Sequence, residues 1–142
     1  MELFVDTSAL VKLYYSEPDS DQVEEWILGA TRVFISELSR VEFASALAKK
    51  VRIGEIDAET CLEIWNSFRD DLESTQLEVL SLLEEDYAQA IELLLEFGAS
   101  DNLRTLDSLQ LAAALREPQS LFLSSDIILA RMAEKVGLRL AP

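Results

Sequence analysis

The stretch Leu3-Phe4-Val5-Asp6 constrains the fold more than any other part of the chain, because it places a charge directly after a short apolar run. An apolar run of this length, with the β-formers Phe and Val, is typical of a buried strand. Thr7 or Ser8 then offers a side-chain oxygen that caps a following helix. Asp6 is therefore predicted to lie at the carboxyl end of a central strand, where ligands bind in open α/β sheets.

Strand-like and helix-like segments alternate along the rest of the chain. Short apolar runs predict strands at residues 3–5, 32–36, 77–82, 120–124 and 138–140. Helical spacing of apolar residues predicts helices at 9–15, around 23–29, and at 36–51, 57–74, 84–97, 106–115 and 126–135, with a loop at 98–102. This alternation predicts an α/β fold, a three-layer α/β/α sandwich with a central parallel sheet. Since no linker or internal repeat divides the chain, residues 1–142 are predicted to form a single domain.

The composition restricts the chemistry that the chain can perform. It has no histidine and one cysteine, Cys61. A Ser-His-Asp or Cys-His nucleophile is therefore excluded, and a structural zinc site nearly so. A lone cysteine agrees with a reducing cytoplasm. No signal peptide is recognisable, and no apolar run approaches the roughly 20 residues of a membrane span, so we expect a cytoplasmic protein without membrane contact.

The net charge of −15 comes from 27 acidic and 12 basic residues. Such a charge opposes non-specific attraction to nucleic acid. Three interpretations remain open: a soluble acidic protein, a protein with a basic partner, or a protein whose carboxylates gather around divalent cations that contact phosphate.

Four carboxylates interrupt otherwise apolar surroundings. Asp6 and Asp126 follow predicted strand ends, whereas Glu42 and Asp107 lie on predicted helices. Each alone also fits a structural role: a helix cap for Asp6 and Asp126, a capping box for Glu42, and complementation of the helix dipole for Asp107. If the first and fourth strands are neighbours, however, all four converge in one crevice. Their mutual repulsion there favours a bound cation, and Mg²⁺ or Mn²⁺ suits oxygen ligands.

Four segments of the chain, taken in order, carry a family resemblance. They are Phe4–Tyr14, Ser36–Glu42, Leu103–Ala112 and Leu121–Asp126. In these segments the chain resembles the PIN-domain nucleases, and most closely the VapC-type toxins of bacterial and archaeal toxin–antitoxin pairs. The resemblance implies a PIN-like sheet with strand order 3-2-1-4-5. It departs from the family pattern at Gln110, where many relatives carry His.

The resemblance also implies the composition of the active site. Its catalytic and metal-binding acids are Asp6, Glu42, Asp107 and Asp126, and its supporting hydroxyl residues are Thr7, Ser8 and Ser124. In the mechanism that we hypothesise, the three aspartates bind metal directly, and Glu42 completes the site or orients water.

We therefore expect a Mg²⁺- or Mn²⁺-dependent endoribonuclease that cleaves RNA phosphodiesters by metal-activated water, the toxin of a toxin–antitoxin pair. The resemblance implies two further partners: a small antitoxin whose C-terminal segment inhibits the enzyme, and a second copy of the chain in a homodimer. One alternative is a catalytically silent PIN-like binding module that docks a basic protein. Phosphotransfer on Asp6 is disfavoured, because no second Asp follows two residues later.

Few basic residues lie close to the four acids in sequence. Lys12 and Arg40 are the candidates for RNA contact, since they follow Asp6 and precede Glu42. Trp26, Trp65 and Phe68 have helical spacing among aliphatic residues, which favours core packing over stacking on bases.

Overall fold

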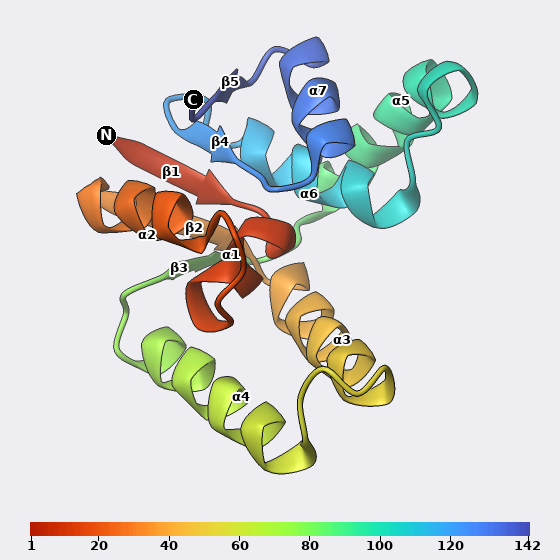
Figure 1. Cartoon of the computed structure of the whole chain (residues 1–142). Helices are drawn as coiled ribbons and strands as arrows, with labels where there is room; N and C mark the ends of the chain where they lie inside the picture. The colour runs from red at the N-terminus through yellow and green to blue at the C-terminus, as the bar shows by residue number, and fades with distance from the viewer.

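The computed structural model describes residues 1–142, and strands alternate with helices along the chain (Figure 1). The strands are β1 (Glu2–Val5), β2 (Arg32–Ser36), β3 (Glu78–Leu80), β4 (Leu121–Leu123) and β5 (Arg139–Leu140). The helices are α1 (Thr7–Tyr14), α2 (Ser20–Gly29), α3 (Leu38–Arg52), α4 (Ala58–Glu73), α5 (Glu84–Asp101), α6 (Thr105–Leu115) and α7 (Ile127–Lys135). None of these helices is long and apolar enough to cross a membrane.

The five strands form one sheet in the order β3-β2-β1-β4-β5, and every neighbouring pair is parallel. Phe4 of the central strand β1 lies opposite Phe34 of β2 and Phe122 of β4. The predicted strand order is confirmed. Because all strands run in one direction, their carboxyl ends meet at a single edge of the sheet, and this edge is called the carboxyl edge below.

Successive side chains of β1 point to opposite faces and so supply two separate cores. Leu3 and Val5 belong to a buried cluster with residues of α1, α2, α3 and α4. Phe4 belongs to a second cluster with residues of α5, α6 and α7, where its ring stacks on Phe122 with centroids 5.8 Å apart. Helices therefore cover both faces of the sheet, which confirms the three-layer α/β/α architecture.

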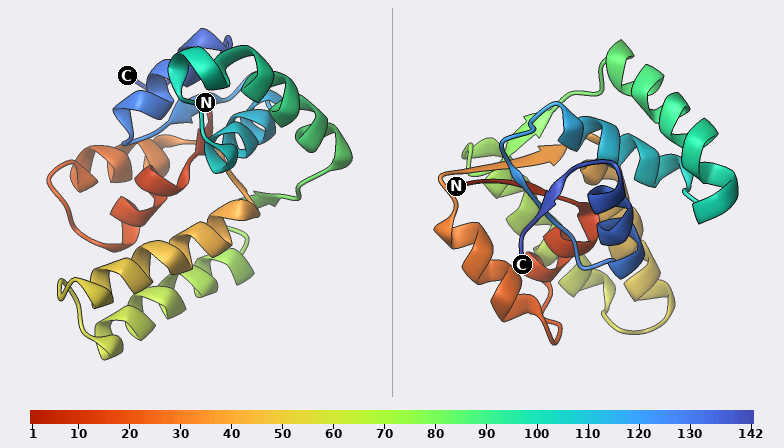
Figure 2. Two further views of the ribbon diagram at one scale, coloured as in Figure 1. Left: turned by 90° about the vertical axis from the view of Figure 1, so that its right-hand side faces the viewer. Right: turned by 90° about the horizontal axis from the view of Figure 1, so that it is seen from above.

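Helices α3 and α4 lie side by side as an antiparallel pair that extends away from the sheet (Figure 2). An aromatic cluster fixes this pair to α1. Phe43 stacks on Phe68 with centroids 4.2 Å apart, and Tyr14 packs edge-on against both rings. Phe68 is fully buried, and Trp65 and Trp26 pack against the same core. The prediction that these aromatic residues belong to the core is confirmed.

Helix α5 is longer than the sequence pattern predicts. It continues through Gly98 and ends at Asp101, so the predicted loop at 98–102 is wrong. Asn102 ends the helix in the left-handed conformation with φ 54°, which Asn tolerates better than most residues. Lys135 donates to Asp101 at 2.7 Å and holds the last turn against α7. The sequence pattern underestimates the length of the helix because it does not include this contact with α7.

The cap of α1 also differs from the expectation. Thr7 begins the helix, and the preceding residue, Asp6, is the N-cap. Oδ1 of Asp6 accepts a hydrogen bond from the backbone N–H of Ala9 at 3.0 Å. The prediction that Thr7 or Ser8 caps the helix is therefore wrong, whereas the helix cap considered as a structural role for Asp6 is confirmed. A carboxylate at this position satisfies the helix N-terminus and complements its dipole.

Candidate active site at the carboxyl edge

The structure places the four predicted acids around the carboxyl edge of the sheet. Asp6 follows β1 directly, and Asp126 comes three residues after the end of the adjacent strand, β4. Glu42 lies in the second turn of α3, and Asp107 lies in the first turn of α6. Parallel pairing of β1 with β4 is what brings the beginning and the end of the chain to one place.

Asp6 is held from several directions. Its backbone N–H extends the strand pairing by donating to the carbonyl oxygen of Leu123 at 3.1 Å. The Ser8 hydroxyl donates to the carboxylate at 2.8 Å, and the Ser124 hydroxyl donates to Oδ2 at 2.6 Å. The residue is 2% exposed. Burial raises the pKa of Asp6 to about 6, although the hydrogen bonds from Ser124, Ala9 and Ser8 act in the opposite direction.

Ser124 also connects Asp6 to Asp126. Besides donating to Asp6, its Oγ accepts the backbone N–H of Asp126 at 3.0 Å. Oδ1 of Asp126 in turn accepts from the N–H groups of Ile128 at 2.9 Å and Leu129 at 3.1 Å, and so caps α7. Asp126 thus combines the helix-capping role with a place at the carboxyl edge.

Glu42 is bound by residues from two other helices. Thr7 donates its hydroxyl to Oε1 of Glu42 at 2.8 Å, and Nε2 of Gln110 donates to the same oxygen at 2.7 Å. The hydroxyl of Ser39, one turn earlier on α3, lies 2.9 Å from Thr7 Oγ1. Two residues of this network, Gln110 and Ser39, were not among the predicted site residues. The sequence had marked Ser39 only as the partner of Glu42 in a capping-box pattern, and Gln110 only as a departure from the family pattern.

Asp107, in the first turn of α6, is half-buried. Burial raises the pKa of its carboxyl group, and the negative charges of Asp126 and Glu42 raise it further. Arg104, whose Nε lies 3.6 Å from Oδ2 of Asp107, lowers this pKa. Asp107 and Asp126 line a cavity of about 290 Å³, together with the buried side chains of Leu129 and Met132. Asp107 therefore interacts electrostatically with Asp126 and Glu42 and shares this cavity with Asp126, whereas Asp6 and Glu42 do not line it.

The donor set suits a hard divalent cation in its chemistry. Every candidate ligand is a carboxylate oxygen, the type that Mg²⁺ and Mn²⁺ prefer. The repulsion that raises the pKa of Asp107 is also what a bound cation would relieve. However, no three acidic, His or Cys residues lie close enough together to hold one ion in the described conformation. The metal-binding roles of these acids stay a prediction.

The basic residues near the edge differ in how freely they are presented. Lys12 is paired with Asp19 and lies 3.7 Å from Glu17, and its side chain is only 16% exposed. Arg40 is 51% exposed, with Glu37 at 3.5 Å. Arg104 is 74% exposed and stands beside Asp107. Arg104 was not predicted, although its position three residues before Asp107 would have indicated it.

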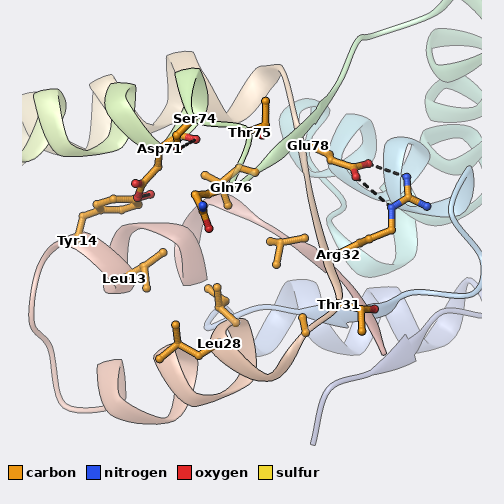
Figure 3. Close-up of a pocket in the computed structure, with 14 residues that line it drawn as sticks. Leu13, Tyr14, Leu28, Thr31, Arg32, Asp71, Ser74, Thr75, Gln76 and Glu78 are labelled. Atoms are coloured by element: carbon orange, nitrogen blue, oxygen red, sulfur yellow. Dashed lines mark hydrogen bonds and ion pairs between the residues drawn. The ribbon is translucent and has the colours of Figure 1, made fainter.

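A larger cavity, of about 680 Å³, lies elsewhere, between α1, α2, the end of α4 and the first residues of β2 and β3 (Figure 3). Tyr14 donates to Asp71 at 2.6 Å on one side of it, and Arg32 forms a two-pronged pair with Glu78 at 3.0 and 2.7 Å on another. None of the four acids lines this cavity. It is therefore separate from the predicted site.

Comparison with known proteins gives a family and a fold. The model of the PIN domain family matches residues 3–135. No curated protein matches the sequence.

Solved structures resemble the chain over nearly its whole length. VapC20 from Mycobacterium tuberculosis, a sarcin–ricin loop cleaving toxin, has a TM-score of 0.71 and 16% identity, covering 92% of this chain and 94% of its own. DNA-bound VapBC from Salmonella typhimurium has a TM-score of 0.70 and 16% identity, and the match covers 99% of this chain and 98% of that chain. VapBC2 from Rickettsia felis, bound to a DNA fragment from its promoter, has a TM-score of 0.69 and 17% identity, and the match again covers 99% of this chain and 98% of that chain. At these identities the likeness shows a shared fold.

Proposed function

The chain belongs to the PIN domain family, and from this we propose that it is a Mg²⁺- or Mn²⁺-dependent endoribonuclease that acts as the toxin of a toxin–antitoxin pair. The observation that carries the proposal is the gathering of Asp6, Glu42, Asp107 and Asp126 around one edge of the sheet, with Asp6 buried and oriented by two hydroxyl groups. Burial raises the pKa of Asp6 to about 6 in spite of these hydrogen bonds and its role as a helix cap, so its charge is costly to the fold at neutral pH, and a bound cation would offset that cost.

In this proposal Asp6, Asp107 and Asp126 hold the metal, and Glu42 completes the site. A bound divalent ion would supply polarisation of the scissile phosphate and activation of water. The protein's own groups keep the carboxylates in place: Ser8 and Ser124 at Asp6, and Thr7 at Glu42. No side-chain nucleophile is needed, which agrees with a chain that lacks histidine.

RNA must be held by a protein whose net charge is −15. We assign the main phosphate contact to Arg104, because it is the most exposed of the three cations beside the acids. Arg40 is a second contact, as predicted. Lys12 is a weaker candidate than the sequence suggested, because Asp19 and Glu17 already neutralise it.

The antitoxin partner is supported by the fold likeness to VapBC assemblies and by the charge of the chain. An acidic toxin favours a partner whose inhibitory C-terminal segment is basic, since complementary charge speeds association and adds specificity. The homodimer expected from the family resemblance is part of the same proposal.

Manganese-dependent cleavage of RNA by the wild type and by Asp107→Asn tests the proposal. We expect the variant to lose more than about 100-fold in rate, because even the outer-shell partners of metal ligands account for about 10–100-fold. Asp21→Asn is the matched control: Asp21 lies in the first turn of α2 and is exposed, so the substitution removes the same charge at an equivalent helix position.

Two outcomes would contradict the proposal. Equal cleavage by the wild type and Asp107→Asn would indicate a contaminating nuclease. Absence of cleavage by the wild type on any RNA, together with tight binding of a basic protein, would favour the catalytically silent binding module.

A further inference from the structure

Gln110, in the second turn of α6, lies beneath the acids and contacts three polar side chains from other helices. Its Nε2 donates to Oε1 of Glu42 at 2.7 Å, and it lies 3.0 Å from Ser39 Oγ and 3.2 Å from Thr7 Oγ1. The side chain is 2% exposed. One buried amide therefore ties α6 to both α3 and α1 at the point where Glu42 is held.

The orientation of this amide is set by Glu42. The two hydrogens of Nε2 face three oxygen atoms, while Oε1 of Gln110 is buried without a hydrogen-bond partner. Turning the amide over would place Oε1 against the negative carboxylate of Glu42, which is unfavourable. In this orientation the N–H group of Gln110 donates to Glu42, and its own carbonyl oxygen is left without a hydrogen bond.

An unsatisfied buried oxygen lowers stability. An apolar side chain of the same shape avoids that cost but removes the donor from Oε1 of Glu42. Packing alone therefore does not explain an amide at this position. Residues that lower stability in this way are found where function requires them. The benefit of Gln110 must lie at Glu42, the group to which its shortest hydrogen bond is made.

We propose that Gln110 is a positioning residue that fixes the Glu42 carboxylate for metal binding, an inference that rests on the proposed function. Thr7 and Gln110 both donate to Oε1, so Oε2 of Glu42 has no protein donor. One oxygen of the carboxylate is anchored, and the other is left for a ligand. Hydrogen bonds of this kind set the orientation of ligating carboxylates in metal sites.

The test measures Mn²⁺ binding to the full-length chain by isothermal titration calorimetry. Gln110→Met keeps the length of the side chain and removes the amide, and we expect the affinity for Mn²⁺ to fall by about 10–100-fold. Gln110→His restores an N–H donor, and we expect it to recover most of that loss. Ser120→Ala is the control: Ser120 is buried and donates to the Glu117 carbonyl at 2.7 Å, at the opposite end of β4 from the acids.

Thermal unfolding of the same variants separates positioning from stability. We expect Ser120→Ala to lower the melting temperature without changing the affinity for Mn²⁺. Unchanged affinity in Gln110→Met would overturn the proposal. So would a loss of affinity in Ser120→Ala as large as that in Gln110→Met, because it would show that any destabilising change has the same effect.

A second measurement does not depend on metal. In metal-free crystals we expect one conformer of Glu42 in the wild type, bound to Thr7 and Gln110, and a displaced or mobile Glu42 in Gln110→Met. An unchanged Glu42 in the variant would contradict positioning even if the metal data agreed with it. A wild type that binds no Mn²⁺ yet shows the expected change at Glu42 would refute the proposed function and leave Gln110 as the residue that holds Glu42.

Discussion

Ser124 donates its hydroxyl hydrogen to Oδ2 of Asp6 at 2.6 Å, although 118 residues separate the two along the chain. The bond crosses from the end of β4 to the end of β1, where the two strands run parallel and side by side. It is shorter than most hydroxyl hydrogen bonds, as expected when the acceptor is a carboxylate. The pKa and the orientation of the Asp6 carboxylate therefore depend on a residue that is far away in the sequence.

Replacement of Ser124 by Ala is expected to raise the pKa of Asp6 above its value of about 6, because the hydrogen bond from Ser124 lowers it. A hydrogen bond to a charged group contributes about 1.5–3 kcal/mol, so an increase of about 1–2 in the pKa is expected. Carboxyl ¹³C NMR titration of the metal-free protein measures it. Ser120→Ala should leave the titration of Asp6 unchanged, and an unaltered pKa in Ser124→Ala would contradict the prediction.

The pH dependence of stability should also carry the signature of Asp6. Burial raises its pKa from 3.8 to about 6, so the folded chain binds this proton more tightly than the unfolded chain does. Stability is therefore lost as the pH rises from about 4 to about 6, and the full cost is present at pH 7. Without divalent metal, Asp6→Asn should be more stable than the wild type at pH 7 by roughly 2–3 kcal/mol.

Urea unfolding at pH 7 and at pH 4 tests this sign. The advantage of Asp6→Asn should shrink to roughly 0.5 kcal/mol at pH 4, because the wild-type carboxyl group is then protonated in the folded state and partly protonated in the unfolded state. A constant difference between the two proteins at both pH values would show that ionisation of Asp6 is not its cause.

The sequence was sufficient to predict the strands and the place of the acids, for a clear physical reason. Strand β2 was predicted with its observed bounds, because its apolar run has polar residues on either side. Asp6 and Asp126 follow strands that pair in parallel, and parallel strands end at one edge. The local sequence pattern, an acid after a strand, was therefore enough to predict where Asp6 and Asp126 lie in the fold.

Two of the features that the sequence did not predict depend on contacts between distant elements. The last turn of α5 is held by the pair between Lys135 and Asp101. The role of Gln110 appears only when α1, α3 and α6 are packed together. The exposure of Arg104 beside Asp107 and the neutralisation of Lys12 by Asp19 involve side chains nearby in the sequence, and they become visible only in the folded chain.

Arg104→Gln is expected to weaken RNA binding without unfolding the protein, because the side chain is largely exposed. Loss of one phosphate contact should weaken binding about equally across RNA sequences and reduce the slope of log K against log salt by about 1. Fluorescence anisotropy of single-stranded RNA without divalent metal, at several salt concentrations, measures both. Arg69→Gln, an exposed change on α4, is the control, and an equal loss in both variants would indicate a general charge effect.

Phe68→Ala is expected to lower the free energy of unfolding by about 3–5 kcal/mol. Its ring is fully buried and stacks on Phe43, so the substitution opens a cavity where α3, α4 and α1 meet. Leu62→Ala, an exposed change on the same helix, should stay within about 0.5 kcal/mol of the wild type. Urea denaturation gives both values, and similar effects from the two would contradict the aromatic cluster as the main link.

The position of β4 beside β1 has a consequence for synthesis of the protein. A nascent chain carries Asp6 well before it carries Ser124 and Asp126, which follow only after β4, which starts at Leu121, has left the ribosome. Until then the central strand has no neighbour on that side, and the cap of α7 does not exist. Under the proposed function, translation that stops before Asp126 therefore releases fragments without a working nuclease centre, and the cell meets the activity only in chains that extend beyond this residue.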